Sequence, residues 1–520
     1  MLELIIETFI LNRLGYGHSA EDIALLKEIG YEKYLEQQLN PDEADDPVLK
    51  EKLAEASFPM NMGRGKEVDK PLFLYEAPVK TLWVKEMEGP EFERRAERAV
   101  NEVMYVSLMR AVYSKWQLKE QLVAFWHNHF NVNVEADERI QLLFPLYDKV
   151  VRKHAFGNFR AFLEEVAKSP AMLYYLNNAS SKASPANENF ARELFELMTL
   201  GADHYLNHLY NRWREVPGAF EGKAEGYIDE DVYEAARAFT GWTVADGSED
   251  ERGGILPNTG EFYYFEGWHD NYQKRVLGVE FYPNEPAMAD GRKVLDLVAY
   301  HPGTALHLCE KLCRRFVSDN PSEALIKQAA DTWMKHQKSD NQIQEVMRTI
   351  LLSQEFSDSL GKKLRNPLEL FVAFWRAMGM EFKPNEEHSW FLYYMGYRHF
   401  RWPTPTGHPD VAEHWVNSFK MLTRWNLIPM LFEQEWEEHQ GERLMAMIPT
   451  DAKSCHDIVY FWSFKILGNA LPVDTHDKIV NYLAMGGVGT EPPFVKGQEL
   501  EYIMLQVIAI IAMTPQFQYR

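Results

Sequence analysis

The chain of 520 residues is 46% hydrophobic and 25% charged, a balance typical of folded globular proteins, so wholesale disorder is excluded. Its 55 basic and 77 acidic residues give a formal net charge of −22, which argues against nucleic acids and anionic membrane surfaces as partners. The sequence contains no uncharged apolar run of the roughly 18 residues that a membrane-crossing helix needs, and we therefore expect no transmembrane span.

The first eleven residues are apolar but carry two glutamates and no basic segment, which predicts an amphipathic helix rather than a signal peptide. We therefore expect a cytoplasmic protein, with a periplasmic location through a partner as the alternative. Cys309 and Cys313 lie one helical turn apart, a spacing that favours buried thiols over a disulfide or a pair of metal ligands.

In chain order, residues 1–95 are predicted to form N-terminal helices followed by a charged, exposed connector with short helices. From residue 96 to about residue 130 apolar side chains recur at helical spacing, which predicts the longest helix of the chain. This helix begins a second predicted segment, a helical core over residues 96–380, and residues 381–520 are predicted to form a C-terminal helical region.

The long predicted helix ends in the stretch Trp-His-Asn-His-Phe at residues 126–130. His127 and His129 are two residues apart and point to nearly opposite sides of a continuous helix, so they converge only if the helix frays there. Otherwise one of them is structural. Either imidazole is a candidate metal ligand or base, and Asn128 between them adds an amide to the same candidate site.

Residues 187–197 form a second polar stretch, predicted as a helix between a preceding proline and a following glycine. One side of this helix carries Glu193 and Glu196, and an adjoining side carries Glu188 and Arg192 at the i, i+4 spacing of an ion pair. We expect Arg192 to be a buried positioning residue held by Glu188. The alternative is a solvated face with ordinary Glu–Arg pairs.

Residues 202–226 are a polar, aromatic excursion that we expect to cover the mouth of the candidate site. It contains His204 and His208 at the i, i+4 spacing common in metal sites, for which a surface position is favoured over a ligand role.

β character is predicted only around residues 243–282, where residues 261–265 and 275–279 are expected to form a short ribbon. His269 and Asp270 lie between these two stretches, and Lys274 follows them. Helices are then predicted at residues 289–300, 302–317, 321–336, 341–352 and 367–378, and near 457–467, 474–485 and 498–513. The predicted fold class is therefore mainly α, a large multi-helical body with a small β excursion.

Nucleotide-binding glycine loops, the nucleophile elbow of acyl-transfer enzymes and the His-Glu-x-x-His zinc motif are all missing from the sequence. A set of other motifs resembles the bacterial "domain of unknown function 1800" family over nearly the full length. These motifs are residues 11–17 (Leu-Asn-Arg-Leu-Gly-Tyr-Gly), 126–130, 188–193, 231–242, 269–278 and 415–418 (Trp-Val-Asn-Ser). The resemblance implies a largely helical protein without an established activity. It also implies a gene neighbour that encodes a sulfatase-like or phosphatase-like protein, which is a candidate partner.

Three functions are compatible with these residues. The first is a metal-dependent enzyme, specifically a hydrolase, in which zinc, manganese or iron lowers the pKa of a bound water. The second is a non-catalytic partner or assembly factor for the sulfatase-like or phosphatase-like protein, with the same residues in a buried polar network. The third is a metal-free glycoside hydrolase with paired carboxylates. For the first, the expected ligands are His127, His129, Glu193, Glu196 and His269, and the expected catalytic residues are Glu188, Asp270, Arg192, Asn128 and Lys274.

Overall fold

The computed structural model describes residues 2–61, 67–84, 89–250, 254–359, 361–434 and 440–520. Helices dominate these residues, and the strands in them form three separate two-stranded sheets. The predicted mainly α fold is confirmed. None of the helices in the described ranges is both long and apolar enough to cross a membrane.

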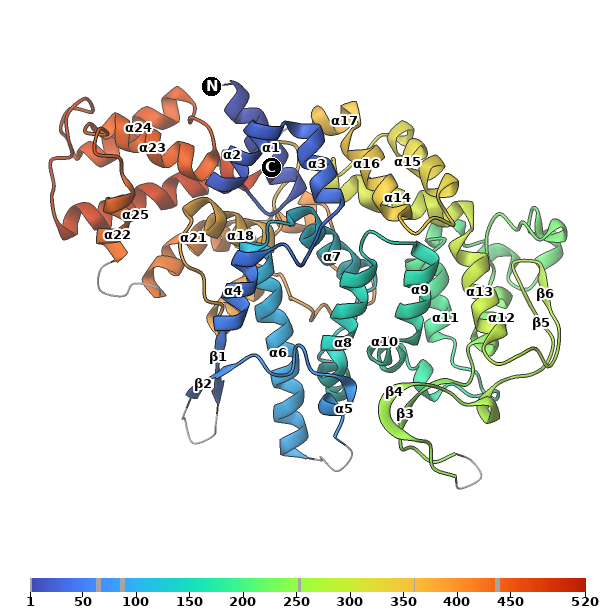
Figure 1. Cartoon of the computed structure of the whole chain (residues 1–520). Coiled ribbons are helices and arrows are strands. Elements are labelled where there is room, and N and C mark those ends of the chain that lie inside the picture. Colours follow the sequence, from blue (N-terminus) through green and yellow to red (C-terminus); the bar gives the residue numbers. More distant parts are fainter. Residues whose placement is uncertain (1, 62–66, 85–88, 251–253, 360, 435–439) are drawn as a thin grey trace.

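The first half of the chain contains short helices around two long ones, α6 and α8, which pack along one another in the middle of the molecule (Figure 1). The helices of this half are α1 (Leu2–Leu14), α2 (Ala20–Ile29), α3 (Tyr31–Leu39), α4 (Pro47–Glu55), α5 (Val79–Leu82), α6 (Pro90–Tyr113), α7 (Gln117–His129), α8 (Glu138–His154), α9 (Phe159–Lys168), α10 (Pro170–Tyr175), α11 (Asn189–Glu193) and α12 (Asp229–Ala238).

The second half is helical from residue 289 onward, as its apolar spacing predicts. Its helices are α13 (Ala289–Ala299), α14 (Pro302–Phe316), α15 (Glu323–Lys335), α16 (Gln342–Leu351), α17 (Gln354–Ser357), α18 (Pro367–Met378), α19 (Glu386–Tyr394), α20 (Ala412–Trp415), α21 (Ser418–Gln434), α22 (Gln440–Met447), α23 (Cys455–Leu467), α24 (Val473–Ala484), α25 (Gln498–Met513) and α26 (Pro515–Gln518).

The local signals at α18 explain why this helix has its predicted bounds. Asn366 and Glu369 form a reciprocal capping box, in which each side chain accepts a hydrogen bond from the other residue's backbone N–H at 2.9 Å. Pro367 occupies the first turn, where its missing N–H costs nothing, and Gly379 ends the helix with φ +65°.

The β structure differs from the prediction in its pairing. Strand β3 (Trp242–Asp246) pairs with β4 (Asn258–Tyr264), and β5 (Lys274–Val276) pairs with β6 (Val279–Phe281), both antiparallel. The predicted ribbon between residues 261–265 and 275–279 is therefore wrong, because each stretch finds its partner closer in the sequence. A further hairpin, β1 (Ser57–Asn61) with β2 (Glu67–Pro71), lies in the predicted helical connector.

Two of the predicted helices are interrupted. The predicted helix of residues 96–130 is two helices, because α6 ends at Tyr113 and α7 begins at Gln117. The predicted helix of residues 187–197 begins only at Asn189, and after Glu193 it continues as one π-helical turn, Leu194–Met198. Single π turns often mark functional positions in helices.

Apolar side chains form two large cores. One joins α1–α3 to α7–α16, and the other joins α18 and α19 to the C-terminal helices α21–α26. Helix α6 contributes to both, through Val103 and Val106 to the first and through Leu108 and Val112 to the second. The three-segment division at residues 95 and 380 stays a prediction.

The C-terminal end of the chain lies beside α1 (Figure 1). The Arg520 guanidinium pairs with Glu369 at 2.6 Å and donates to the carbonyl oxygens of Asn12 and Arg13 at 3.3 and 3.4 Å. These contacts hold α1 against α18, so the last residue of the chain helps to fix the first helix.

Candidate functional site

His129 is enclosed at the C-terminal end of α7, and both of its ring nitrogens have protein partners. Nε2 lies 3.2 Å from the carbonyl oxygen of Met198, and Nδ1 lies 2.9 Å from the Lys311 ammonium. Burial, with a smaller effect of the Lys311 charge, holds the pKa of His129 well below its ordinary value. The ring is therefore neutral, with Nε2 donating to Met198 and Nδ1 accepting from Lys311.

His127 points to the other side of α7, toward α8, where it joins a buried network of ion pairs. Its Nε2 lies 2.9 Å from one carboxylate oxygen of Asp148, and the other oxygen accepts from Arg152 Nε at 2.8 Å. Arg152 also contacts both oxygens of Glu120, at 2.9 and 3.1 Å. Burial alone would raise the pKa of Asp148, but Arg152 and His127 together hold it well below its usual range.

Asn128 connects α7 to the loop of residues 402–410. Its amide nitrogen donates to the His408 carbonyl at 2.9 Å, and its amide oxygen accepts from the His408 backbone N–H at 2.6 Å. Gly407 makes this approach possible, because it has φ +70° and any Cβ there would lie 2.2 Å from the Asn128 carbonyl oxygen.

A polar cavity of about 30 Å³ lies where these segments meet, with His127, Asn128, His399 and His408 among its lining residues. Burial lowers the pKa of both His399 and His408 to about 3, so these rings are neutral at physiological pH. A volume of this size holds one or two water molecules.

Arg192 and Glu188 form the predicted pair, but at the surface. Their nearest atoms are 3.3 Å apart, and the two side chains are 32% and 54% exposed. Arg192 also lies 3.6 Å from Asp229. The expectation of a buried positioning pair is therefore wrong, because this side of α11 faces solvent rather than the core.

Glu193 and Glu196 lie close together where α11 passes into the π turn. Burial raises the pKa of Glu193, and the neighbouring Glu196 charge raises it further. Arg192 opposes this shift but has the smallest effect of the three. The two carboxylates are thus the like-charged pair that the sequence predicts on one side of this helix.

His269, Asp270 and Lys274 form a third polar group, beside α12 and α13. His269 Nδ1 contacts the Thr240 carbonyl at 2.9 Å, and Nε2 lies 3.3 Å from Asp290. Lys274, fully buried, donates to the same Asp290 carboxylate at 2.7 Å.

Asp270 in this group is bound on both oxygens by the Arg237 guanidinium, at 2.7 and 3.1 Å. Burial works against the charged form, but Arg237 lowers the pKa of Asp270 below its ordinary value. Each charge of the third polar group is thus balanced by an opposite charge of the protein.

The expected site residues therefore fall into separate places. His127 and Asn128 share one cavity, Glu193 and Glu196 share one helix, and His269, Asp270 and Lys274 share one network. Among the residues that the structure describes, no three of the five expected ligands bring ligand atoms within 4.8 Å of one another.

Several partners of these residues were missing from the sequence-based site: Asp148, Arg152, Lys311 and Asp290. Asp148 and Arg152 could have been recognised in the sequence as a buried ion pair. They are four residues apart and interrupt the apolar side of α8 next to Tyr147 and Val151. Lys311 and Asp290 could not have been recognised in this way, because only the tertiary fold brings them to His129 and His269.

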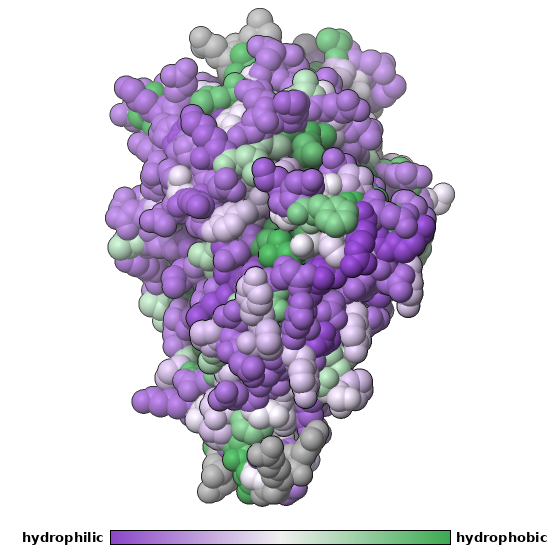
Figure 2. Space-filling view, turned by 90° about the vertical axis from the view of Figure 1, so that its right-hand side faces the viewer, coloured by the Kyte–Doolittle hydropathy of each residue, from purple (hydrophilic) through white to green (hydrophobic). Residues whose placement is uncertain are grey.

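The excursion of residues 202–226 borders a cavity of about 890 Å³ together with α13 and the start of α14. Leu277, Leu297 and Leu306 contribute to its apolar wall, and His204 and His301 to its polar wall. The face that carries α12 and α13 is mainly hydrophilic, with apolar residues exposed in its middle part (Figure 2). The size of the cavity suits a small ligand.

A family model described as "Protein of unknown function (DUF1800)" matches residues 9–519. The chain therefore belongs to this family, as its motifs predict. No curated protein and no solved structure matches the chain.

Proposed function

We propose that this protein works by binding, as a non-catalytic partner or assembly factor, and that its motif residues are the scaffold of the binding surface. The observation that carries this proposal is that the motif side chains are paired with other groups of the protein. His129 and His269 use both ring nitrogens on protein partners, and Asp270 uses both oxygens on Arg237.

Such pairing favours a structural role over a catalytic one. A metal ligand or a general base needs a free lone pair directed at the ion or the substrate. At His129, an ion at either nitrogen would have to displace Lys311 or the Met198 carbonyl from a buried position. Buried polar networks whose members are all paired make a fold rigid and specific.

A candidate binding surface lies on α19, beside α6. Trp390 and Tyr393 are 56% and 48% exposed, and Arg398 lies over the Tyr393 ring at 5.3 Å from its centroid. Next to them is a cavity of about 390 Å³ that Arg398 and Arg401 also line. Exposed aromatic residues together with arginines are the composition of the energetic centres of protein interfaces.

The partner class comes from the family resemblance, which implies a sulfatase-like or phosphatase-like protein encoded beside this chain. Isothermal titration of this chain with that purified protein is the test. A Trp390→Ala, Tyr393→Ala double variant should bind at least about 30-fold more weakly, since hot-spot residues contribute 2 kcal/mol or more. Tyr233→Ala, at a tyrosine 52% exposed on α12, is the matched control and should bind like the wild type. Absence of binding by the wild type would refute the proposal.

A metal-dependent hydrolase is the second candidate, favoured by one observation, the Glu193–Glu196 pair. Two neighbouring carboxylates repel, and a divalent cation such as zinc, manganese or iron would relieve this repulsion. Hydrolysis of phosphate and sulfate esters, assayed with each ion and with chelator, tests this candidate. Glu193→Gln should abolish metal-dependent activity, and Glu323→Gln, at an exposed glutamate of α15, should not. Activity that survives the chelator would favour the metal-free glycosidase chemistry of paired carboxylates instead.

A further inference from the structure

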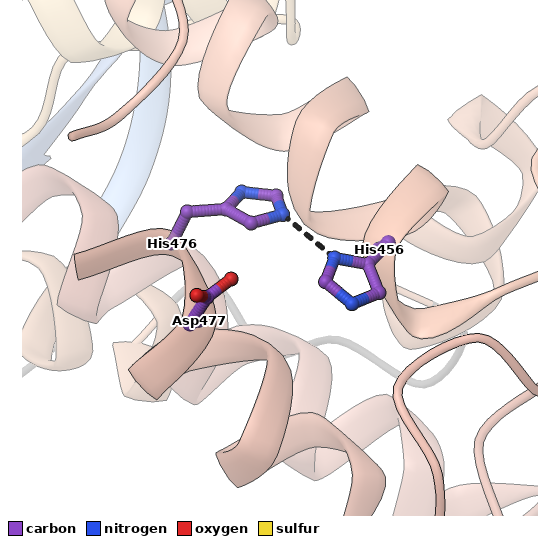
Figure 3. Close-up of side chains that lie close together, drawn as sticks. All are labelled: His456, His476 and Asp477. Atoms are coloured by element: carbon purple, nitrogen blue, oxygen red, sulfur yellow. Dashed lines mark hydrogen bonds between the residues drawn. The ribbon is translucent and has the colours of Figure 1, made fainter. Parts of the chain in front are cut away.

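The C-terminal helices bring two histidines and an aspartate together at a place that none of the sequence motifs includes. His456 lies in the first turn of α23, and His476 and Asp477 lie in the first half of α24. His456 Nδ1 is 3.1 Å from His476 Nε2. Figure 3 shows the two rings directed at one another, with the Asp477 carboxylate beside them.

One ligand atom from each of these three side chains lies within 4.8 Å of the other two. In the part of the chain that the structure describes, this is the one group of three histidine, cysteine, aspartate or glutamate residues with that property. It contrasts with the motif histidines His129 and His269, whose ring nitrogens bond to lysine, carbonyl or carboxylate groups.

The spacing of the two ring nitrogens fits a shared metal ion. Zinc binds imidazole nitrogen at 2.0–2.1 Å, so two such ligands at a tetrahedral angle are about 3.3 Å apart. The observed 3.1 Å is close to this value, and an ion can replace the shared proton after a small movement of either ring.

The burial of the three side chains suits an ion held at the edge of the helix pair. The His476 ring is buried and the His456 ring is half-buried, so an ion between them would lie partly out of water. Asp477 is exposed and supplies a negative charge on the solvent side. Two histidines and one carboxylate with a side open to water are a ligand set that zinc accepts.

We propose that His456, His476 and Asp477 form a zinc-binding site that joins α23 to α24, with the fourth position of the ion open to water. The ordinary alternative is an imidazole–imidazole hydrogen bond that holds the two helices without an ion. This site shares no residue with the Glu193–Glu196 pair or the α19 surface. An experiment on zinc binding here therefore tests this proposal separately from the proposed functions.

The test uses the full chain, stripped with a chelator and titrated with zinc chloride by calorimetry against a competing chelator. The wild type should bind one zinc ion at this site, and its melting temperature should rise with zinc concentration. Asp477→Asn and His456→Ala should each weaken zinc binding. The loss of affinity should exceed the roughly 10- to 100-fold weakening that follows removal of a residue hydrogen-bonded to a metal ligand.

Two matched variants serve as controls and should bind zinc like the wild type. Asp474→Asn removes an exposed carboxylate of the same helix that pairs with Lys478, and His336→Ala removes the histidine that follows α15 at its C-cap. Asp477 is exposed, so its variant should fold, and circular dichroism of the stripped protein verifies this.

Bound cobalt gives a second readout, since its visible absorption distinguishes tetrahedral from octahedral coordination. The tetrahedral spectrum should appear with the wild type and be lost in Asp477→Asn. The proposal is overturned if the wild type binds no stoichiometric zinc. It is equally overturned if Asp477→Asn and His456→Ala bind zinc as tightly as the controls, because the ion would then lie elsewhere.

Discussion

Two arginine–carboxylate pairs at the same helical spacing allow burial alone to be tested. Arg152 pairs with Asp148 and Arg192 pairs with Glu188, both at i, i+4. The side chains of the first pair are 8% and 1% exposed, and those of the second are 32% and 54% exposed. We therefore expect Arg152→Ala to destabilise the protein strongly and Arg192→Ala to have almost no effect.

The magnitudes follow from what each substitution leaves behind. Removal of Arg152 takes the guanidinium away from two buried carboxylates and leaves Asp148 with His127 and Tyr75 as partners; breaking a buried pair costs about 3–5 kcal/mol. An exposed pair contributes only about 0–1 kcal/mol. With an unfolding entropy of about 2.1 cal/mol/K per residue, 520 residues that unfold as one unit have about 1.1 kcal/mol/K. The melting temperature should thus fall by about 3–5 °C in Arg152→Ala and by less than about 1 °C in Arg192→Ala.

Differential scanning fluorimetry at two pH values is the assay. In Arg152→Ala the guanidinium no longer opposes the effect of burial, so the pKa of Asp148 in the folded protein rises from its low wild-type value and the penalty shrinks as the pH falls through it. The gap to the wild type should therefore be narrower at pH 5 than at pH 7. Equal shifts for the two arginine variants, or a gap that does not respond to pH, would refute this reasoning.

Three further predictions concern other parts of the same region. Gly407→Ala should destabilise the protein more than Gly379→Ala, because both glycines have positive φ but only at Gly407 would a Cβ meet a backbone atom. Burial lowers the pKa of Lys311 to about 8, so between pH 8 and about 10.5 folding releases a proton and stability should rise with pH, by roughly 1–3 kcal/mol in urea titrations. Glu193→Gln should stabilise the metal-free protein by roughly 0.2–0.5 kcal/mol at pH 7, because it removes a like-charge repulsion.

Each of these has its own control. If Gly379→Ala lowers the melting temperature as much as Gly407→Ala, the close approach of the loop to α7 contributes nothing. Lys311→Met should abolish the alkaline rise in stability, and a rise that persists in this variant must come from another group. For Glu193→Gln, a loss of stability in the chelator-treated protein would mean that the carboxylate makes a favourable contact.

The sequence by itself determined where most helices lie. Apolar spacing with caps and prolines predicted α18 at its observed bounds, 367–378, and placed α14 at 302–317 against the observed Pro302–Phe316. These signals are local, since a helix closes its hydrogen bonds within four residues and its caps lie at its own ends. The full-length family resemblance could also be recognised from the sequence, because it rests on short motifs in a fixed order.

The pairing of the strands and the local irregularities of the helices could not be predicted from the sequence. A strand can pair with any neighbour of suitable pattern, so residues 261–265 could be assigned to the ribbon but not to their partner β3. The π turn after Glu193 and the break between α6 and α7 leave the helical pattern of residue types almost unchanged.

The chemistry of the motif residues was decided only by the tertiary structure. The sequence supplied His129, Asp270 and Glu193 as polar groups, yet their pKa values and availability depend on burial and on partners far along the chain. Lys311 meets His129 across 182 residues, and Arg237 meets Asp270 across 33. The same holds for His456 and His476, which are unremarkable in the sequence until α23 and α24 pack together. Electrostatic interactions act through space, so the character of a site follows from which charges the fold brings within a few ångströms.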